Sequence, residues 1–400
     1  MRVAFPATRF LDPDNIKSWS GLPFFIKRAL EEAGLEIVTM PLVEEPDDGG
    51  RWPRFLYWRW LRGKRYLRHC ESKLLKGYAR QLERHLAAQP VDIVFSPSTW
   101  PIAYLETNLP VVFWTDACFA GMLDFYGSFT EVAPPSIKAG HAAEQGALDR
   151  CARAIYSSDW AAQMAAKYYQ IEPSRISIVP FGGNLLEPPT IEEARAGVRA
   201  RDMSPCNLLL VGVDWKRKGV DVAVETVEAL NAAGLNARLT VVGCQAPSTR
   251  DLPACVEIIP FIGKDTVDDR RRLGEIFKRS HFFIMPSRAE AFGLVFAEAS
   301  AFGVPCLASK VGGISSAIID DINGRLFPLE AGGAEYADYI LKCLHNRDRY
   351  HQLALRTAED GAARLSWEAA GRKVAKLLDD IVRQRTAAAM AEWTVEAAKP

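Results

Sequence analysis

The stretch FFIMPSRAEAFGLVFAEA, residues 282–299, decides the fold class. It opens with four apolar residues, Phe282–Met285, which have the length and composition of a buried strand, and Pro286 ends that strand. A helix is expected to begin near Gly293 and to end at Gly303, because glycine commonly stands just beyond the end of a helix. A buried strand followed by a loop and a helix is the repeating unit of a parallel α/β sheet.

The same alternation of short apolar and longer amphipathic runs extends along the chain in both directions. The predicted strands are 3–5, 36–38, 92–95, 111–114, 154–156, 176–179, 208–211, 238–242, 281–285 and 304–308, and the predicted helices include 23–33 and 220–233. Glycine and proline gather between Pro180 and Pro189, as in a hinge. The sequence therefore predicts two α/β domains, residues 1–181 and 182–370, followed by a helical segment, residues 371–400.

The composition argues against several classes of protein. The 400 residues include 49 basic and 49 acidic side chains, whereas a sequence-independent nucleic-acid binder carries an excess of Lys and Arg. We therefore expect no nucleic-acid partner. The eight cysteines are scattered without a C-x-x-C pair, which argues against zinc and fits the reduced thiols of a cytoplasmic protein. The sequence has no run of about 18 apolar residues, so no membrane-spanning helix is expected.

The predicted helix near residue 293 offers a site for an anion. Its first N–H groups, at Phe292, Gly293 and Leu294, lie at the carboxyl edge of the sheet, where α/β folds bind phosphate. Glu290 precedes this helix and Glu298 lies within it. Two isolated glutamates would be interpreted as solvent-exposed. Beside a phosphate site, however, they suit the hydroxyl groups of a sugar at each end of a diphosphate.

Glu290 and Glu298, with seven residues between them, stand in PSRAEAFGLV (residues 286–295) and before Gly303-Val304-Pro305. This pattern resembles the family 4 retaining glycosyltransferases. The resemblance extends from about Met1 to the region around Trp367. It implies the GT-B fold, with two facing Rossmann-like α/β/α domains, a cleft between them and the nucleotide sugar in the C-terminal domain. It also implies that Glu290 contacts the donor sugar and that Glu298 holds the ribose hydroxyls.

The stretch LLLVGVDWKRKG, residues 208–219, resembles the strand, glycine turn and Lys-Gly pair of the same family. Lys218 matches the lysine that neutralises the departing diphosphate in that family. The family's usual arginine after the turn glycine is Val213 here, and we expect Arg217 to supply that charge, since a guanidinium suits a phosphate. A solvated basic turn remains the alternative.

Two candidate residues lie in the first domain. Gly21 follows Ser20 where the family often carries a glycine pair near the donor phosphates or the acceptor, although a tight turn alone also explains a glycine there. Asp116 follows the predicted strand 111–114, where relatives often place His or Asp facing the acceptor. We predict that Asp116 orients the acceptor or handles its proton. A capping aspartate is the alternative.

We expect no metal and no cofactor besides the nucleotide-sugar co-substrate. Asp12-Pro13-Asp14 has the look of an acidic metal-binding pair, but its proline favours a turn. The fold that the chain resembles needs no metal either.

Residues 51–80 hold ten basic side chains against one acidic residue, Glu71, and aromatic residues lie among them. Basic and aromatic residues together suit an anionic membrane surface or a polyanionic acceptor. The alternative is a pair of helices with the aromatics in the core and a basic outer face. We therefore expect a cytoplasmic protein with peripheral membrane contact through residues 51–80.

These patterns predict a retaining hexosyltransferase that moves a sugar from a nucleotide diphosphate sugar to an unidentified acceptor. Asp116, Glu290 and Lys218 are its expected catalytic residues. The expected donor-binding residues are Gly21, Arg217, Lys218, Glu290, Phe292, Gly293, Leu294 and Glu298. Two alternatives stay open, namely a nucleotide-sugar epimerase or phosphorylase with two similar domains, and a non-catalytic protein that binds nucleotide sugars.

Overall fold

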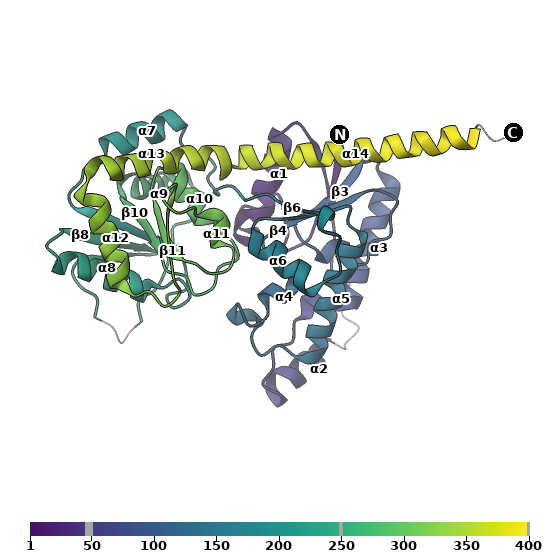
Figure 1. Ribbon diagram of the computed structural model, residues 1–400. Coiled ribbons are helices and arrows are strands. Elements are labelled where there is room, and N and C mark those ends of the chain that lie inside the picture. The colour runs from purple at the N-terminus through teal and green to yellow at the C-terminus, as the bar shows by residue number, and fades with distance from the viewer. Residues whose placement is uncertain (45–50, 248–250, 398–400) are drawn as a thin grey trace. The chain divides into compact units, whose positions relative to one another are not determined.

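The computed structural model describes residues 1–44, 51–247 and 251–397, which form two units (Figure 1). Unit 1 comprises Met1–Val179 and Ala370–Pro400, and unit 2 comprises Pro180–Ala369. Each unit has a parallel six-stranded sheet flanked by helices, which confirms the predicted α/β fold class. Residues 371–400, which we expected to form a separate helical segment, group with unit 1, and their last three residues lie outside the described part of the chain.

The sheet of unit 1 has the strand order β2-β1-β3-β4-β5-β6. Its strands are β1 (Arg2–Ala7), β2 (Glu36–Pro41), β3 (Ile93–Ser96), β4 (Val111–Thr115), β5 (Arg153–Tyr156) and β6 (Ile176–Ile178). Each of them overlaps a strand predicted from the sequence. The chain leaves β1 in one direction along the sheet and later returns in the other. Because parallel crossovers are right-handed, the helices of these two directions cover opposite faces.

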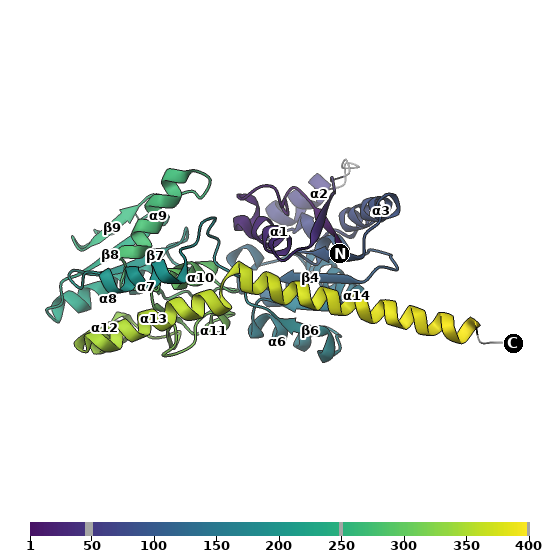
Figure 2. The ribbon, with the colours of Figure 1, turned by 90° about the horizontal axis from the view of Figure 1, so that it is seen from above.

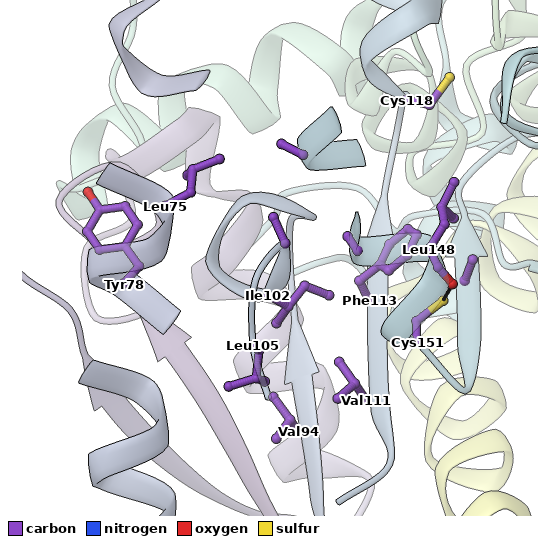
Figure 3. Packing of buried hydrophobic residues seen from close by; sticks show 14 of the residues in the cluster. Leu75, Tyr78, Val94, Ile102, Leu105, Val111, Phe113, Cys118, Leu148 and Cys151 are labelled. Atoms are coloured by element: carbon purple, nitrogen blue, oxygen red, sulfur yellow. Dashed lines mark hydrogen bonds between the residues drawn. The ribbon is translucent and has the colours of Figure 1, made fainter. Parts of the chain in front are cut away.

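The helices of unit 1 are α1 (Leu22–Glu32), α2 (Arg51–Leu56), α3 (Ser72–Ala88), α4 (Phe119–Met122), α5 (Pro134–Arg150), α6 (Asp159–Tyr168) and most of α14 (Trp367–Ala397). Helices α3, α5 and α6 share one apolar core with the sheet. Figure 3 shows this core, in which Phe113 of β4 lies near Leu148 of α5, and Tyr78 and Leu75 of α3 lie together at another part of the cluster. Helix α1 covers the other face, and α14 lies against it. A Cβ atom at Gly371 would lie 2.4 Å from the carbonyl oxygen of Ala29.

The sheet of unit 2 has the strand order β12-β11-β10-β7-β8-β9. Its strands are β7 (Cys206–Val211), β8 (Ala237–Val242), β9 (Val256–Ile259), β10 (Phe282–Met285), β11 (Cys306–Ser309) and β12 (Gly324–Phe327). The two edge strands, β9 and β12, were not predicted. Asn323 leads into β12, and its side chain accepts from the N–H of Ile319 at 2.7 Å.

The helices of unit 2 are α7 (Ile191–Ala200), α8 (Val220–Ala232), α9 (Val267–Arg279), α10 (Leu294–Ala301), α11 (Ile314–Ala317), α12 (Gly333–His345) and α13 (Arg347–Arg364). Helix α8 links β7 to β8, whereas α9 and α10 link strands that follow in the opposite direction along the sheet. They therefore lie on opposite faces, as Figure 2 shows for α8 and α9. Among the described helices, none combines the length and apolarity needed to cross a bilayer.

Candidate functional site

Helix α10 begins where the sequence predicted. Gly293 is its N-cap residue with φ +85°, and Gly303, just beyond its end, has φ +61°. A side chain at Gly293 would be crowded as well as strained, because its Cβ would lie 2.5 Å from the ring of Phe296 and 3.3 Å from the Cγ of Glu290. The backbone therefore needs glycine here, and this turn places Glu290 directly beside the start of the helix.

Glu290 holds two cations. Its Oε2 atom accepts from the ammonium group of Lys218 and from the guanidinium group of Arg217, the latter at 3.3 Å. Arg217 also donates to the carbonyl oxygen of Ala289 at 3.1 Å. Glu290 is 9% exposed and Lys218 8% exposed, so the carboxylate and the ammonium are largely shielded from water. The structure thus brings together three of the predicted site residues.

The loops that carry these residues are locked to each other. They follow β7 and β10, which are neighbours in the sheet. The N–H of Arg288 donates to the carbonyl of Arg217 at 2.8 Å, and the guanidinium of Arg288 binds both carboxylate oxygens of Asp221 at 2.7 and 3.0 Å. Gly219 has φ +69°, and its Cβ would lie 2.1 Å from the carbonyl of Pro286. A larger residue there would push the two loops apart.

Glu298 lies inside α10 and is 3% exposed. Its Oε1 atom accepts from the ammonium of Lys264 at 2.5 Å. Lys264 was missed because it follows β9, a strand that the sequence did not reveal. Its one available signal was a lysine after a glycine, Gly263, beyond a short apolar run. Nearby, a Cβ at Gly183 would lie 2.7 Å from the N atom of Glu298, so the segment after residue 182 packs directly on this helix.

The start of α10 has the properties of an anion site. Within the described residues, the N–H groups of Phe292, Gly293 and Leu294 have no acceptor in the protein, as expected for the first groups of a helix. They carry the positive end of the helix dipole, and Lys218 and Arg217 add two full charges next to Glu290. Arg217 also lies 4.0 Å from the exposed carboxylate of Asp214, so the two cations face the buried Glu290 and this second carboxylate.

A cavity of about 630 Å³ also lies in unit 2, between α7 and α9. Its lining includes Lys264 and Arg270. Neither of these two was predicted, and none of the predicted donor-binding residues lines this cavity. The chemistry of Lys218 and Glu290 therefore lies outside this cavity.

Asp116 of unit 1 lines a separate cavity of about 840 Å³. Other lining residues come from distant parts of the unit and include Trp19, Arg68, His69 and Glu144. Gly21 does not line this cavity. It is the N-cap residue of α1 and ends a run of left-handed residues, Trp19, Ser20 and Gly21, with φ of +40°, +57° and +85°. Such strain is concentrated at functional segments, and here it shapes the turn that brings Trp19 to the cavity wall.

Two titratable residues of this cavity were missed. Glu144 is buried, its Oε2 accepts from Thr99 at 2.9 Å, and its Oε1 has no partner within the described chain. Burial raises the pKa of Glu144 to about 7. His69 stacks on Trp100 with ring centroids 4.5 Å apart, and burial lowers the pKa of His69 to about 4. The signal for Glu144 was its position on the buried stripe of α5, between Ala143 and Ala147.

Two family profiles match the chain. The profile described as "Glycosyl transferases group 1" matches residues 205–346, and the one described as "Glycosyltransferase Family 4" matches residues 26–185. The first lies in unit 2 and contains the Glu290 cluster, and the second contains Asp116 and part of the lining of the unit 1 cavity, whose residues before 26 lie outside the match.

Curated relatives and solved structures agree with these matches. The D-inositol 3-phosphate glycosyltransferase of Gordonia bronchialis is 29% identical over 238 residues, which are 56% of this chain and 51% of that protein. That of Xylanimonas cellulosilytica is 30% identical over 240 residues, 56% of each. The chain thus aligns with about half the length of these relatives.

The fold is similar to that of solved glycosyltransferases. Sucrose-phosphate synthase from Thermosynechococcus elongatus superposes with a TM-score of 0.66 at 19% identity, covering 97% of this chain and 100% of that one. WaaG, a glycosyltransferase of lipopolysaccharide biosynthesis, superposes with a TM-score of 0.61 at 18% identity, covering 94% and 99%. The chain belongs to the group 1 (family 4) glycosyltransferases and has their two-domain GT-B fold.

Proposed function

We propose that this protein transfers a hexosyl group from a nucleotide diphosphate sugar to an acceptor hydroxyl, with retention of the anomeric configuration. The observation that carries the proposal is the cluster at the start of α10, where Lys218 and Arg217 share one oxygen of Glu290. A diphosphate suits this corner because it meets two cations and the first N–H groups of a helix.

The donor would bind along α10. Its diphosphate accepts from the N–H groups of Phe292, Gly293 and Leu294 and from the two cations. Glu298, deeper in the helix, takes the ribose hydroxyls, and Lys264 orients its buried carboxylate. When the diphosphate engages Lys218 and Arg217, it competes with Glu290 for them, so the carboxylate becomes available to the hydroxyls of the sugar. A structural neighbour, Anabaena HepE, has been solved with UDP-glucose, which supports a donor of this class.

In the proposed reaction the bond between the anomeric carbon and the diphosphate oxygen breaks. The acceptor oxygen forms its bond to that carbon on the same face, and the acceptor proton leaves with the diphosphate. Lys218, Arg217 and the helix N–H groups stabilise the departing charge, which is preorganised electrostatic catalysis. We propose that no divalent metal is needed, because these groups already meet that charge. Chelator should therefore leave the transfer rate unchanged.

We assign the acceptor to unit 1, with Asp116 as the residue that orients the attacking hydroxyl. Two polar atoms of the cavity that Asp116 lines, Oε1 of Glu144 and Nε2 of His69, have no hydrogen-bond partner among the described residues. Such groups suit a ligand rich in hydroxyls. The names of the curated relatives describe transfer to a phosphorylated inositol, which supports a polyol or sugar acceptor of this kind.

The decisive experiment screens nucleotide sugars by thermal shift and then follows release of nucleoside diphosphate with and without a crude acceptor extract. A true donor stabilises the protein by mass action. Release that depends on the extract supports transfer, whereas binding without release in any extract supports a non-catalytic binding protein. A folded Lys218→Ala, Arg217→Ala double variant should lose about 2–4 kcal/mol of transition-state stabilisation. Unchanged turnover in that variant would exclude the proposed role of the two cations.

A further inference from the structure

Residues 51–61 form a surface element that the proposed reaction does not use. They comprise α2 (Arg51–Leu56) and the π-helical turn η2 (Tyr57–Leu61), and we call them the ridge. Five large apolar side chains of the ridge are exposed, namely Trp52, Leu56, Tyr57, Trp60 and Leu61. Trp60 is 78% and Leu61 76% exposed. The interpretation that placed these aromatics in a helical core is therefore wrong for Trp52, Tyr57 and Trp60.

The ridge has two sides. Trp52, Leu56 and Trp60 follow each other at intervals of four residues, which places them along one side of a helical segment. Phe55 and Trp58 are only partly exposed, and their rings contact those of Trp52 and Tyr57. The outer side is thus a continuous apolar strip, and an apolar patch of this kind on a folded protein marks an interaction surface.

Basic residues border the strip. Arg59, Arg62 and Arg65 are exposed, and within the described residues none of them has a carboxylate partner. Lys64 pairs with Glu131, and the side chain of Arg51 lies outside the described part of the structure. The sequence from 51 to 65 contains no acidic residue. Any partner of the ridge must therefore be apolar at its contact surface and negatively charged around it.

The ridge is anchored to unit 1. The N–H of Lys64 donates to the carbonyl of Trp58 at 2.8 Å, and the backbone of Arg65 pairs with Glu131 and Ala133 at 2.7 and 2.9 Å. The guanidinium carbon of Arg68 lies 5.6 Å from the centre of the Trp52 ring. Arg68 also lines the cavity of Asp116, so the ridge adjoins the wall of that cavity.

We propose that the ridge docks this protein on an anionic phospholipid surface. Trp52, Tyr57 and Trp60 insert their rings at the level of the headgroups, where aromatic side chains with one polar atom are stable. Leu56 and Leu61 contact the acyl boundary, and Arg59, Arg62 and Arg65 meet lipid phosphates. A nucleic acid would use the arginines but leave the two leucines in water, so the apolar strip favours the bilayer. This docking does not depend on the proposed glycosyl transfer.

The test is flotation of the full-length protein with phosphatidylcholine vesicles, with and without phosphatidylglycerol, at low and high salt. The wild type should float with the mixed vesicles and less with phosphatidylcholine alone. Trp60→Ser with Leu61→Ser should abolish flotation at both salt concentrations. Arg59→Gln with Arg62→Gln should weaken binding on the order of 25-fold at low salt, since each basic residue contributes about fivefold, and should reduce its salt dependence.

The matched control is Tyr168→Ser with Lys167→Gln. These two residues form an exposed aromatic–cation pair on α6, in which Nζ of Lys167 lies 5.1 Å from the centre of the Tyr168 ring. It should float like the wild type, and all variants should keep the wild-type melting temperature. The proposal is overturned if the wild type fails to float with the mixed vesicles at low salt, or if both ridge variants float as well as it does. A different partner would also overturn it. In that case double-stranded DNA or polyglutamate would retain the wild type, the vesicles would not, and the arginine variant would lose this retention.

Discussion

At the residue scale, one carboxylate oxygen of Glu290 accepts from both Lys218 and Arg217, so removing this carboxylate should affect both cations. Glu290→Gln keeps the shape of the side chain but removes the carboxylate that holds Lys218 and Arg217. Two cations in a largely buried corner then repel each other, so the variant without ligand should be less stable by up to about 3 kcal/mol. A nucleoside diphosphate should relieve this repulsion, bind at least as tightly as in the wild type, and raise the melting temperature by more.

Turnover of Glu290→Gln should nevertheless fall, because its contacts with the sugar matter most as that sugar becomes cation-like. Thermal melts and calorimetric titrations with nucleoside diphosphate measure the two effects separately. Weaker diphosphate binding in this variant would mean that Glu290 belongs to the nucleotide half of the site.

Glu298 should behave in the opposite way. Its carboxylate is buried with Lys264 and is assigned to the ribose. Glu298→Gln should weaken nucleoside diphosphate and intact nucleotide sugar equally, by about 1.5–3 kcal/mol, the range for hydrogen bonds to charged groups. Titration of both ligands tests this expectation. Unchanged affinity for both would remove α10 from the donor site.

Glu144 should make the stability of unit 1 depend on pH. Burial raises the pKa of this carboxyl from 4.5 to about 7, so the folded state holds its proton over a range where the unfolded state has released it. The contribution of Glu144 to the free energy of unfolding is fully present below about pH 4.5. It is lost as the pH rises to about 7, and the loss amounts to about 3 kcal/mol. His69 has the opposite effect. Because its pKa is lowered to about 4, the unfolded state takes up the proton first, and the stability of unit 1 decreases as the pH falls below 6.5.

Glu144 and His69 affect stability over overlapping pH ranges, so the effect of Glu144 must be measured as the difference in stability between the wild type and a Glu144 variant. Urea unfolding of the wild type and of Glu144→Gln should be compared from pH 4.5 to pH 7.5. The stability of the wild type relative to the variant should decrease across that range. A constant difference would show that Glu144 is ionised throughout and that its burial has no such effect.

At the element scale, the start of α10 can be tested with a matched pair of glycines. Gly293 and Gly34 have nearly the same φ, +85° and +87°, but a Cβ at Gly34 would have no atom within 4 Å. Gly34→Ala should therefore cost only the left-handed strain, about 1–2 kcal/mol. Gly293→Ala should cost about 1–3 kcal/mol more, since its Cβ meets the ring of Phe296.

The functional readout separates the two sites as well. Gly293→Ala should also lower affinity for nucleoside diphosphate, whereas Gly34→Ala should not. Equal losses of stability and affinity in both variants would mean that strain alone, and not the close approach to Phe296 and Glu290, requires glycine at the helix start.

The elements that the sequence predicted and those that it hid differ in their surroundings. The ten predicted strands are apolar runs, and most of them have a neighbouring strand on each side. Such strands are buried on both faces, so they can be recognised in the sequence as continuous apolar segments. Strands β9 and β12 are sheet edges of four residues with polar members such as Glu257 and Arg325, and a short half-exposed run resembles a loop. Missing β9 also hid Lys264. The ion pair between Glu290 and Lys218 joins residues 72 positions apart, and no local pattern reveals such a contact.

At the scale of the whole molecule, α14 makes one unit depend on a distant part of the chain. Ala370, Val374 and Leu378 are buried at intervals of four residues, and this stripe packs within unit 1. Leu378→Ala should destabilise unit 1 by about 2–5 kcal/mol. Hydrogen exchange should then accelerate in α1 and stay unchanged in α8 of unit 2. The exposed Lys376→Ala is the control, and faster exchange confined to unit 2 would refute the assignment.

This arrangement has a consequence for the order of assembly during synthesis. Multidomain chains generally complete their first domain while the next is still being translated. Here the ribosome must make all of Pro180–Ala369 before it supplies the helix that covers α1. Unit 2, whose segment is continuous, can therefore reach its native state first, although it is encoded second. Until α14 is made, the surface around Ala29 in the nascent N-terminal half stays exposed to water. The polypeptide should therefore depend most on chaperones at this stage.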